Sequence, residues 1–279
     1  MQLEFAKMHG VGNDVVVMRW PGGQPVPASD RLRAWGDRRL GVGFDQLMLI
    51  DSDYAGPADA AYRVFNADGG EVEQCGNGVR CVAQFLADDS GATEMRLDSR
   101  GGVVTARILE AGRVTVNLGI PTFSPEDLPF DAEREAASYS LSVGGREIEF
   151  GAVSLGNPHA VILTDSVDDA PDGILGAEFQ DSSAFPRGVN VGFMEITGAA
   201  AIRLRVFERG VGETLACGTG AAAAVAIGRD RELLDACVEV SLPGGELEVS
   251  WEGRGEPLWL AGPATKVFEG RIEYEPTED

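Results

Sequence analysis

Arg63 to Gly78 reads RVFNADGGEVEQCGNG, and Arg205 to Gly220 reads RVFERGVGETLACGTG. The two stretches align without a gap at an offset of 142 residues, the separation of Cys75 and Cys217, and share Arg, Val, Phe, Gly, Glu, Cys, Gly and Gly at matching positions. A run of helix-forming residues follows each cysteine and its glycine turn. The repeat therefore indicates a fold built from two related halves, each with one cysteine at a helix start.

A weaker repeat at nearly the same offset supports the duplication. Asn13 in HGVGND and Asn157 in GNPH lie 144 residues apart, and the same number separates Gln46 from Asn190, each of which shortly follows a Gly-Val pair. A duplicated domain of about half the chain is the economical explanation.

The segment at residues 119–140 is rich in proline and acidic residues and has no strong periodicity, as expected of a domain boundary. We expect a first domain at residues 1–118, completed by residues 264–279 and carrying the earlier cysteine. The second domain, residues 119–263, carries the later one.

Many short runs with strand character, separated by turn signals, dominate the chain. Strands are expected at residues 3–8, 15–18, 46–50, 62–66, 94–98, 103–108, 113–118, 147–154, 160–163, 189–196, 202–207, 238–242, 246–251 and 258–260. Helices are expected at residues 29–39, with Ser29 or Asp30 as the N-cap, and after each Cys-Gly pair. We therefore expect an α+β fold of two pseudo-symmetric domains. Each would be a mostly antiparallel, barrel-like sheet wrapped around a central helix, with the active site in the cleft between the domains.

The formal net charge of −22 argues against nucleic acid or an anionic membrane as a partner. This acidity fits either a well-solvated surface or adaptation to a salty cytoplasm. No run of eighteen apolar residues occurs, and the opening MQLEFAKMHG is neither a signal nor a transit peptide. We expect a cytoplasmic protein.

A cysteine in the first turn of a helix has specific chemistry. Unsatisfied N–H groups and the positive end of the helix dipole favour the thiolate and can hold a carboxylate. Two such cysteines facing one small molecule could move a proton from one face of a carbon to the other.

The remaining cysteines, Cys81 and Cys237, are expected to be reduced thiols buried in the core. The C-x5-C spacing of Cys75 and Cys81 is not that of a zinc site, so no metal is expected. Gly218, Gly220 and Ala223 match a loose dinucleotide-binding pattern, but the first copy of the repeat breaks it.

Seven strings spread over nearly the whole chain resemble the diaminopimelate epimerase family, in the family's order. They are KMHGVGND, GVGFDQL, FNADGGEVEQCGNGVRC, SLGNPHAV, VNVGF, FERGVGETLACGTGAAA and GPATKVFEG. The resemblance implies interconversion of LL- and meso-2,6-diaminopimelate without a cofactor, on the route to lysine and peptidoglycan. By the same resemblance Cys75 and Cys217 are the paired acid and base, and His159 and Glu208 tune the two thiols.

The resemblance also implies the substrate-binding residues, which would serve a zwitterion with two amino and two carboxyl groups. They are Asn13, Gln46, Asn66, Gly76, Asn77, Asn157, Asn190, Glu208, Arg209, Gly218 and Thr219. The residues after each cysteine would contribute main-chain N–H groups to stabilise the carbanion. Arg209 is the candidate for the distal carboxylate, which its planar guanidinium suits.

Three positions depart from the family pattern. Val15 replaces a common aromatic, Ala160 a frequent cysteine, and Phe268 a tyrosine that many members place in their dimer contact. A homodimer is expected from the family. Phe268 lacks the tyrosine hydroxyl, which removes a possible hydrogen bond from the dimer contact.

Two other functions fit parts of the pattern. A proline or hydroxyproline racemase would share the two-cysteine plan, but its substrate has no distal carboxylate for Arg209. A thiol redox or binding protein without turnover would use Cys75 and Cys217 only as a disulfide pair. The absence of a C-x-x-C motif argues against that function.

Overall fold

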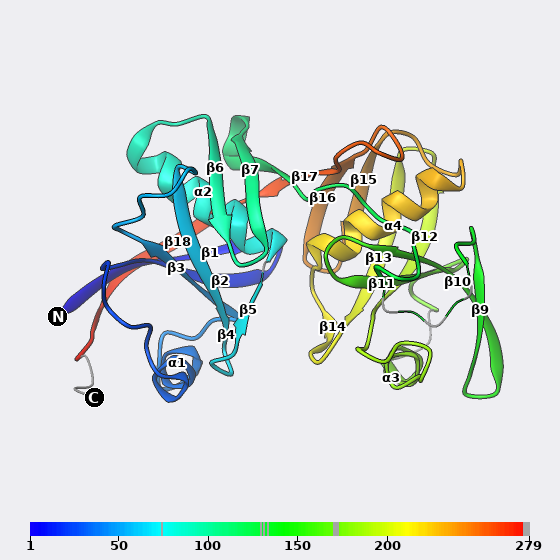
Figure 1. Ribbon diagram of the computed structural model, residues 1–279, viewed down its shortest axis with the longest axis horizontal. Coiled ribbons are helices and arrows are strands. Elements are labelled where there is room, and N and C mark those ends of the chain that lie inside the picture. The colour runs from blue at the N-terminus through cyan, green and yellow to red at the C-terminus, as the bar shows by residue number, and fades with distance from the viewer. Residues whose placement is uncertain (74, 129, 131, 133, 170–172, 276–279) are drawn as a thin grey trace. The chain divides into compact units, whose positions relative to one another are not determined.

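The computed structural model describes residues 1–279 except 74, 129, 131, 133, 170–172 and 276–279. The chain forms two compact units, Met1–Val116 with Gly262–Asp279, and Asn117–Ala261. Each unit is a mixed, mostly antiparallel sheet with a long helix packed inside its curve (Figure 1).

The first unit contains eight strands in one continuous order, with a short ninth strand at one end of β4. Its elements are β1 (Gln2–Gly10), β2 (Asn13–Trp20), α1 (Ser29–Gly36), β3 (Gln46–Asp51), β4 (Ala60–Asn66), β5 (Glu71–Val72), α2 (Gly76–Ser90), β6 (Glu94–Ser99), β7 (Gly102–Ile108), the 3-10 turn η1 (Glu110–Gly112), β8 (Arg113–Asn117) and β18 (Thr265–Glu273). The strands pair in the order β18, β1, β2, β3, β4, β6, β7, β8. Pairings β2–β3 and β4–β6 are parallel, and the others are antiparallel.

The second unit repeats this plan. Its elements are β9 (Tyr139–Val143), β10 (Arg146–Ser154), β11 (Pro158–Leu163), α3 (Gly173–Gln180), β12 (Asn190–Gly198), β13 (Ala201–Glu208), β14 (Gly212–Thr214), α4 (Gly218–Asp230), β15 (Cys237–Leu242), β16 (Gly245–Ser250) and β17 (Trp259–Pro263). The strands pair in the order β9, β10, β11, β12, β13, β15, β16, β17, with β11–β12 and β13–β15 parallel. Strand β14 pairs with β13, as β5 does with β4.

Strand register reproduces the sequence offset residue by residue. In the parallel pairs, Val15 lies opposite Gln46 and His159 lies opposite Asn190. Both partners in the second pair are 144 residues beyond their counterparts in the first. The predicted α+β fold of two pseudo-symmetric, barrel-like sheets with central helices is confirmed.

The two central helices are buried on all sides at their N-terminal ends. Residues 76–83 of α2 are all buried, and α2 packs against β1, β2, β3, β6 and β7. Helix α4 is buried from Gly220 to Gly228 and packs against β10, β11, β12, β13 and β16. A helix apolar on every face belongs inside a core. Small residues, above all the alanine run of α4, allow the sheet to close around it.

The outer faces of the sheets have their own cores. In the first unit Trp20 and Trp35 both pack edge-on against Tyr274. Their ring centroids lie 5.2 and 5.8 Å from that of Tyr274, respectively. In the second unit an aromatic cluster centres on Phe150, which meets Phe179 at 5.0 Å. These cores hold α1 and α3 against the sheets.

Three expectations need correction. Ala28, not Ser29 or Asp30, is the N-cap of α1, because its carbonyl accepts the first helical N–H bonds. Its methyl side chain cannot accept a capping bond. Strand β9 begins at Tyr139, inside the predicted boundary segment. Cys237 is exposed rather than buried. It starts β15, where alternation turns Val238 and Val240 inward and the odd-numbered residues outward.

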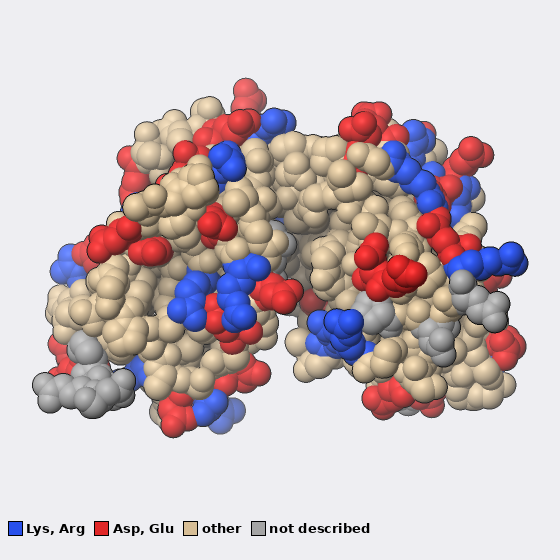
Figure 2. Space-filling model, viewed as in Figure 1, with Lys and Arg blue, Asp and Glu red and all other residues tan. Residues whose placement is uncertain are grey.

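Acidic side chains are scattered across the face of the molecule shown in Figure 2, and many basic side chains lie beside them. In the part of the chain described here, no helix combines the length and apolar character that crossing a membrane requires.

Candidate active site

Cys75 is the N-cap residue of α2 and is partly exposed. Its Sγ accepts a hydrogen bond from the backbone N–H of Gly78 at 3.3 Å. The thiol also lies 3.8 Å from Oδ1 of Asn13, at the start of β2. A Cβ at Gly78 would come within 1.6 Å of the Met48 side chain, so glycine allows the turn to approach the sheet this closely.

A charged network holds Asn13 in place. Asp45 Oδ2 accepts from Asn13 Nδ2 at 3.2 Å and from the backbone N–H of Asp14 at 3.1 Å. Arg38 bridges the carboxylates of Asp14 and Asp45 at 2.7 and 2.6 Å, and Lys7 also binds Asp14. Although burial acts to raise it, hydrogen bonds from Arg38 and Lys7 hold the pKa of Asp14 well below its usual range. Burial and the neighbouring Asp14 raise the pKa of Asp45.

The other predicted residues of the first unit lie on β3, β4 and α2. Gln46 and Asn66 are cross-strand partners, and Gln46 Nε2 donates to Asn66 Oδ1 at 3.2 Å. Gln46 Oε1 is buried without a hydrogen-bond partner. Gly76 and Asn77 form the buried first turn of α2, and Asn77 Oδ1 accepts from Arg80 Nη2 at 2.8 Å.

Cys217 is the N-cap residue of α4 and is only 4% exposed. Its thiol donates to Glu208 Oε2 at 3.1 Å, and Thr214 donates to the other carboxylate oxygen at 2.6 Å. Thr219 Oγ1 lies 3.6 Å from the sulfur. Burial, followed by the nearby charge of Glu208, raises the pKa of the Cys217 thiol well above its ordinary value. The Cys217 thiol is therefore protonated at neutral pH.

A hydrogen-bonded chain connects this thiol to His159. Asn157 Nδ2 donates to Thr219 Oγ1 at 3.3 Å, and Asn157 Oδ1 lies 3.1 Å from His159 Nε2. The imidazole is 1% exposed, and burial, with a smaller contribution from Arg209, lowers its pKa to about 3. The ring is therefore neutral. Because Asn157 Oδ1 only accepts, the geometry assigns the ring proton to Nε2.

Asn190 and Arg209 form the remaining predicted cluster. Asn190 is buried, donates to the carbonyl of Pro158 at 3.2 Å and accepts from the backbone N–H of Arg209 at 2.9 Å. The Arg209 guanidinium is held by the carbonyl of Arg187 at 2.9 Å and is exposed. A bound carboxylate could reach it without a change in the backbone.

Every predicted site residue thus lies at or next to the end of a strand, or at the N-terminus of a central helix of its unit. Sequence reasoning missed Asp45 and Arg38, which orient Asn13, and Arg80 and Thr214, which contact site residues. Arg80 carried a signal, since it interrupts the apolar helix segment VRCVAQF.

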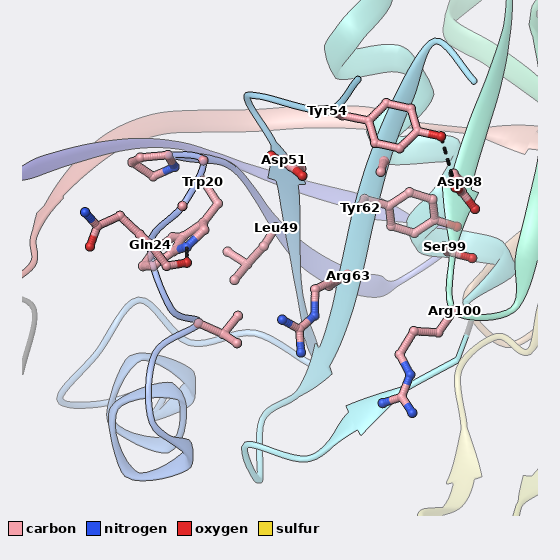
Figure 3. A pocket seen from close by; sticks show the side chains of 15 residues that line it. Trp20, Gln24, Leu49, Asp51, Tyr54, Tyr62, Arg63, Asp98, Ser99 and Arg100 are labelled. Carbon is pink, nitrogen blue, oxygen red and sulfur yellow. Dashed lines mark hydrogen bonds between the residues drawn. The ribbon is translucent and has the colours of Figure 1, made fainter. Parts of the chain in front are cut away.

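A cavity of about 460 Å³ lies elsewhere in the first unit (Figure 3). Trp20, Leu49 and Tyr62 are among its lining residues, and Tyr54 donates to Asp98 at 3.0 Å on one side. Its lining includes none of the predicted site residues. Within the described parts of the chain, no group of three or more His, Cys, Asp or Glu side chains is arranged to hold a metal ion.

The fold has solved counterparts. A hydroxyproline epimerase from Agrobacterium vitis superposes with a TM-score of 0.70 at 18% identity, over 97% of this chain and 92% of that one. This likeness concerns the fold alone.

Sequence comparison goes further. The family model for diaminopimelate epimerase matches residues 5–124 and 151–267. The chain is 48% identical over 278 residues to a diaminopimelate epimerase of Nitrosospira multiformis, covering 99% of this chain and 100% of that one. It is 44% identical over 274 residues to one of Pseudomonas paraeruginosa, covering 98% and 99%. These matches define the protein as an amino-acid epimerase, an isomerase. Within that class, the chain belongs to the diaminopimelate epimerase family.

Proposed function

We propose that the protein interconverts LL- and meso-2,6-diaminopimelate by a two-base mechanism in which Cys75 and Cys217 exchange protons with the α-carbon. The observation that carries this proposal is the repeated placement of a cysteine at the N-cap of a central helix, once in each unit. Inversion at carbon needs a proton acceptor and a proton donor on opposite faces. Two thiols at equivalent positions of a duplicated fold can supply them.

The reaction balances with one proton in and one proton out. In the direction that starts from a Cys75 thiolate, its sulfur takes the α-proton, and the electron pair of the broken C–H bond remains on carbon. The Cys217 thiol then delivers its proton to the other face and becomes the thiolate. The product has the opposite configuration, Cys75 holds the proton taken from the substrate, and the proton of Cys217 is now on the α-carbon. The reverse reaction restores the starting state.

The carbanion requires stabilisation by groups of the chain itself. The N–H groups in the first turns of α2 and α4, at Gly76, Asn77, Gly218 and Thr219, are of the kind that binds a carboxylate at a helix start. As negative charge develops on the substrate carboxylate, these donors stabilise it more strongly. No cofactor is invoked in this scheme.

We further propose distinct roles for the flanking residues. Glu208 keeps Cys217 protonated through its direct hydrogen bond. His159 acts through Asn157 and Thr219, which fix the position of that thiol. Arg209 binds the distal carboxylate. Oriented amides for the amino and carboxylate groups come from Asn13, Gln46 and Asn66 in the first unit and Asn157 and Asn190 in the second.

Proton NMR in heavy water tests this function. Reduced, chelator-treated protein is incubated with LL-diaminopimelate, and L-proline and L-4-hydroxyproline are run in parallel. Loss of the α-proton signal with appearance of the meso isomer in the first sample alone is the expected result. Exchange in a proline sample would reassign the substrate, and no exchange in any sample would favour the redox or binding function.

The remaining family expectations are also part of this proposal: a cytoplasmic enzyme of lysine and peptidoglycan-precursor synthesis that works as a homodimer. In support of a dimer, β18 exposes Val267 and Phe268 at 59% and 48%. Phe268 packs edge-on against Phe5 at 6.1 Å and lacks the hydroxyl of the common tyrosine. Light scattering of wild type and Phe268→Asp tests it, with a dimer expected for the first and a monomer for the second.

A further inference from the structure

Arg80 lies directly behind the first cysteine turn and is completely buried. Its Nη2 donates to Asn77 Oδ1 at 2.8 Å, and its Nη1 donates to the carbonyl of Gly76 at 3.3 Å. One guanidinium therefore ties together the two residues that follow Cys75. Its Nε is buried without a hydrogen-bond partner, and Arg80 forms no salt bridge with any carboxylate that the structure describes.

A buried cation without a carboxylate is costly, so its retention calls for a reason. Burial lowers the pKa of Arg80 to about 10, which leaves the group charged at neutral pH. The ionised forms of Cys81 and Cys75 would oppose this lowering. The guanidinium also lies against the end of β1, since a Cβ at Gly10 would be 3.0 Å from Nη2. Gly10 leads into the loop that carries Asn13.

The second unit has no cation at the equivalent position of α4. The residue 142 positions after Arg80 is Ala222, buried in α4. Cys217 faces the carboxylate of Glu208 at 3.1 Å, where the first unit has the neutral Asn66. A cation thus lies behind one thiol, and an anion binds the other.

The charged network of Asp14, Asp45, Arg38 and Lys7 meets Cys75 through Asn13. Two buried titratable groups near Cys75, Cys81 and Tyr62, are uncharged at neutral pH. Burial raises the pKa of Cys81 to about 12. Burial likewise raises the pKa of Tyr62 on β4, with a smaller contribution from the charge of Cys75. Among Arg80, Cys81 and Tyr62, Arg80 is therefore the group that carries charge at neutral pH.

We propose that Arg80 is a positioning residue that holds the Gly76–Asn77 turn and stabilises Cys75 as the thiolate. The resting enzyme then carries negative charge on Cys75 and a proton on Cys217. The catalytic meaning of this arrangement rests on the proposed two-thiol function, but the protonation states can be measured without turnover.

The test measures alkylation of each cysteine by iodoacetamide as a function of pH, resolved by peptide mass spectrometry in a Cys237→Ser background. Arg80→Met preserves bulk without charge, Arg80→Lys preserves charge but cannot bridge both acceptors, and Val82→Ala is a packing control on the same helix. In Arg80→Met we expect the pH midpoint for Cys75 alkylation to rise by about one pH unit, so that alkylation slows about tenfold at pH values below both midpoints. The Val82→Ala midpoint should match that of the parent.

Arg80→Lys separates the two parts of the proposal. Its Cys75 midpoint should stay near that of the parent, whereas kcat should fall because the turn is no longer bridged. A parent-like midpoint in folded Arg80→Met overturns the proposal. If that variant does not fold, the parent protein decides: the Cys75 midpoint must lie below that of Cys217, and the reverse order overturns it. If the alkylation midpoints are as expected but the protein does not epimerise diaminopimelate, the proposed function is rejected and the role of Arg80 stands.

Discussion

Cys75 and Cys217 occupy the same position in the two units, the residue before a central helix, yet their surroundings differ. Cys75 is partly exposed and meets an amide oxygen, with the Arg80 cation behind its turn. Cys217 is buried and donates to a carboxylate. The duplicated backbone places the two thiols, and a few substituted side chains decide which carries the proton. Two thiols at equivalent backbone positions can therefore differ in protonation state.

The largest expected effect comes from removing either thiol. Cys75→Ala or Cys217→Ala should lower epimerisation by at least about 10³-fold, since each removes a proton-transfer group. Formation of the meso isomer, followed by NMR, is the measurement. Cys237→Ala, an exposed thiol outside the site, is the matched control and should retain activity. Normal turnover in either of the first two variants would refute the two-base mechanism.

Glu208→Gln sharpens the contrast between the two thiols. Removing the carboxylate charge should lower the pKa of Cys217, because that charge helps to raise it. The alkaline limb of the kcat/KM profile should then move to lower pH, with activity reduced about 10²-fold. Asn66→Asp, which adds a carboxylate at the equivalent position of the first unit, serves as the comparison. An unmoved alkaline limb would contradict the assignment of Cys217 as the proton donor.

His159 should make the second unit lose stability in acid, an effect that the first unit lacks at the equivalent position. Its pKa is about 3 in the folded protein, against an ordinary value near 6.5 for an exposed imidazole. The unfolded chain therefore binds a proton that the native chain does not, and stability falls as pH drops from about 6.5 toward 3, by up to about 1.4 kcal/mol per pH unit. The first unit has Val15 at this position.

Urea unfolding of wild type and His159→Gln at neutral and mildly acidic pH tests this contribution. The wild type should lose more stability on acidification than the variant, and Val15→Ala should show the wild-type slope. Equal slopes for wild type and His159→Gln would mean that the native imidazole titrates normally.

The smallest expected effect concerns an ion pair that both units share. Arg63 binds Glu71 through two nitrogens, and Arg205 binds Glu213 in the same way. Glu71→Gln and Glu213→Gln should each lower the free energy of unfolding by less than about 1 kcal/mol, because both pairs are partly solvated. Denaturant midpoints measure the change. A much larger loss at one pair would show that the two hairpins are not equivalent.

Sequence patterns predicted the elements whose residues alternate or repeat clearly. The helices after both cysteines and the strands around Gln46 and Asn190 were predicted correctly, because each is a continuous apolar run bounded by turn residues. Strand β18 was missed, since most of its residues are exposed and show no alternation. Cys237 was misplaced because one residue of register decides between core and solvent.

The site residues were named from resemblance, and the groups that orient them were not. Arg80 in a helix would ordinarily be a solvated charge. It is buried because the sheet encloses the N-terminal half of α2, and its place within the apolar segment VRCVAQF is the one local sign of that enclosure. Asp45 and Arg38 likewise meet Asp14 only after distant segments have come together.

The pairing of β18 with β1 sets the order in which the two units can be completed during translation. Residues 117–261 form the second unit by themselves, so it can fold as soon as they leave the ribosome. The first unit, although begun earlier, waits for residues 265–273. Until then one edge of β1 has no partner, and an open strand edge invites pairing with other chains. A chain interrupted before residue 265 would therefore keep its second unit and be prone to aggregate through its first.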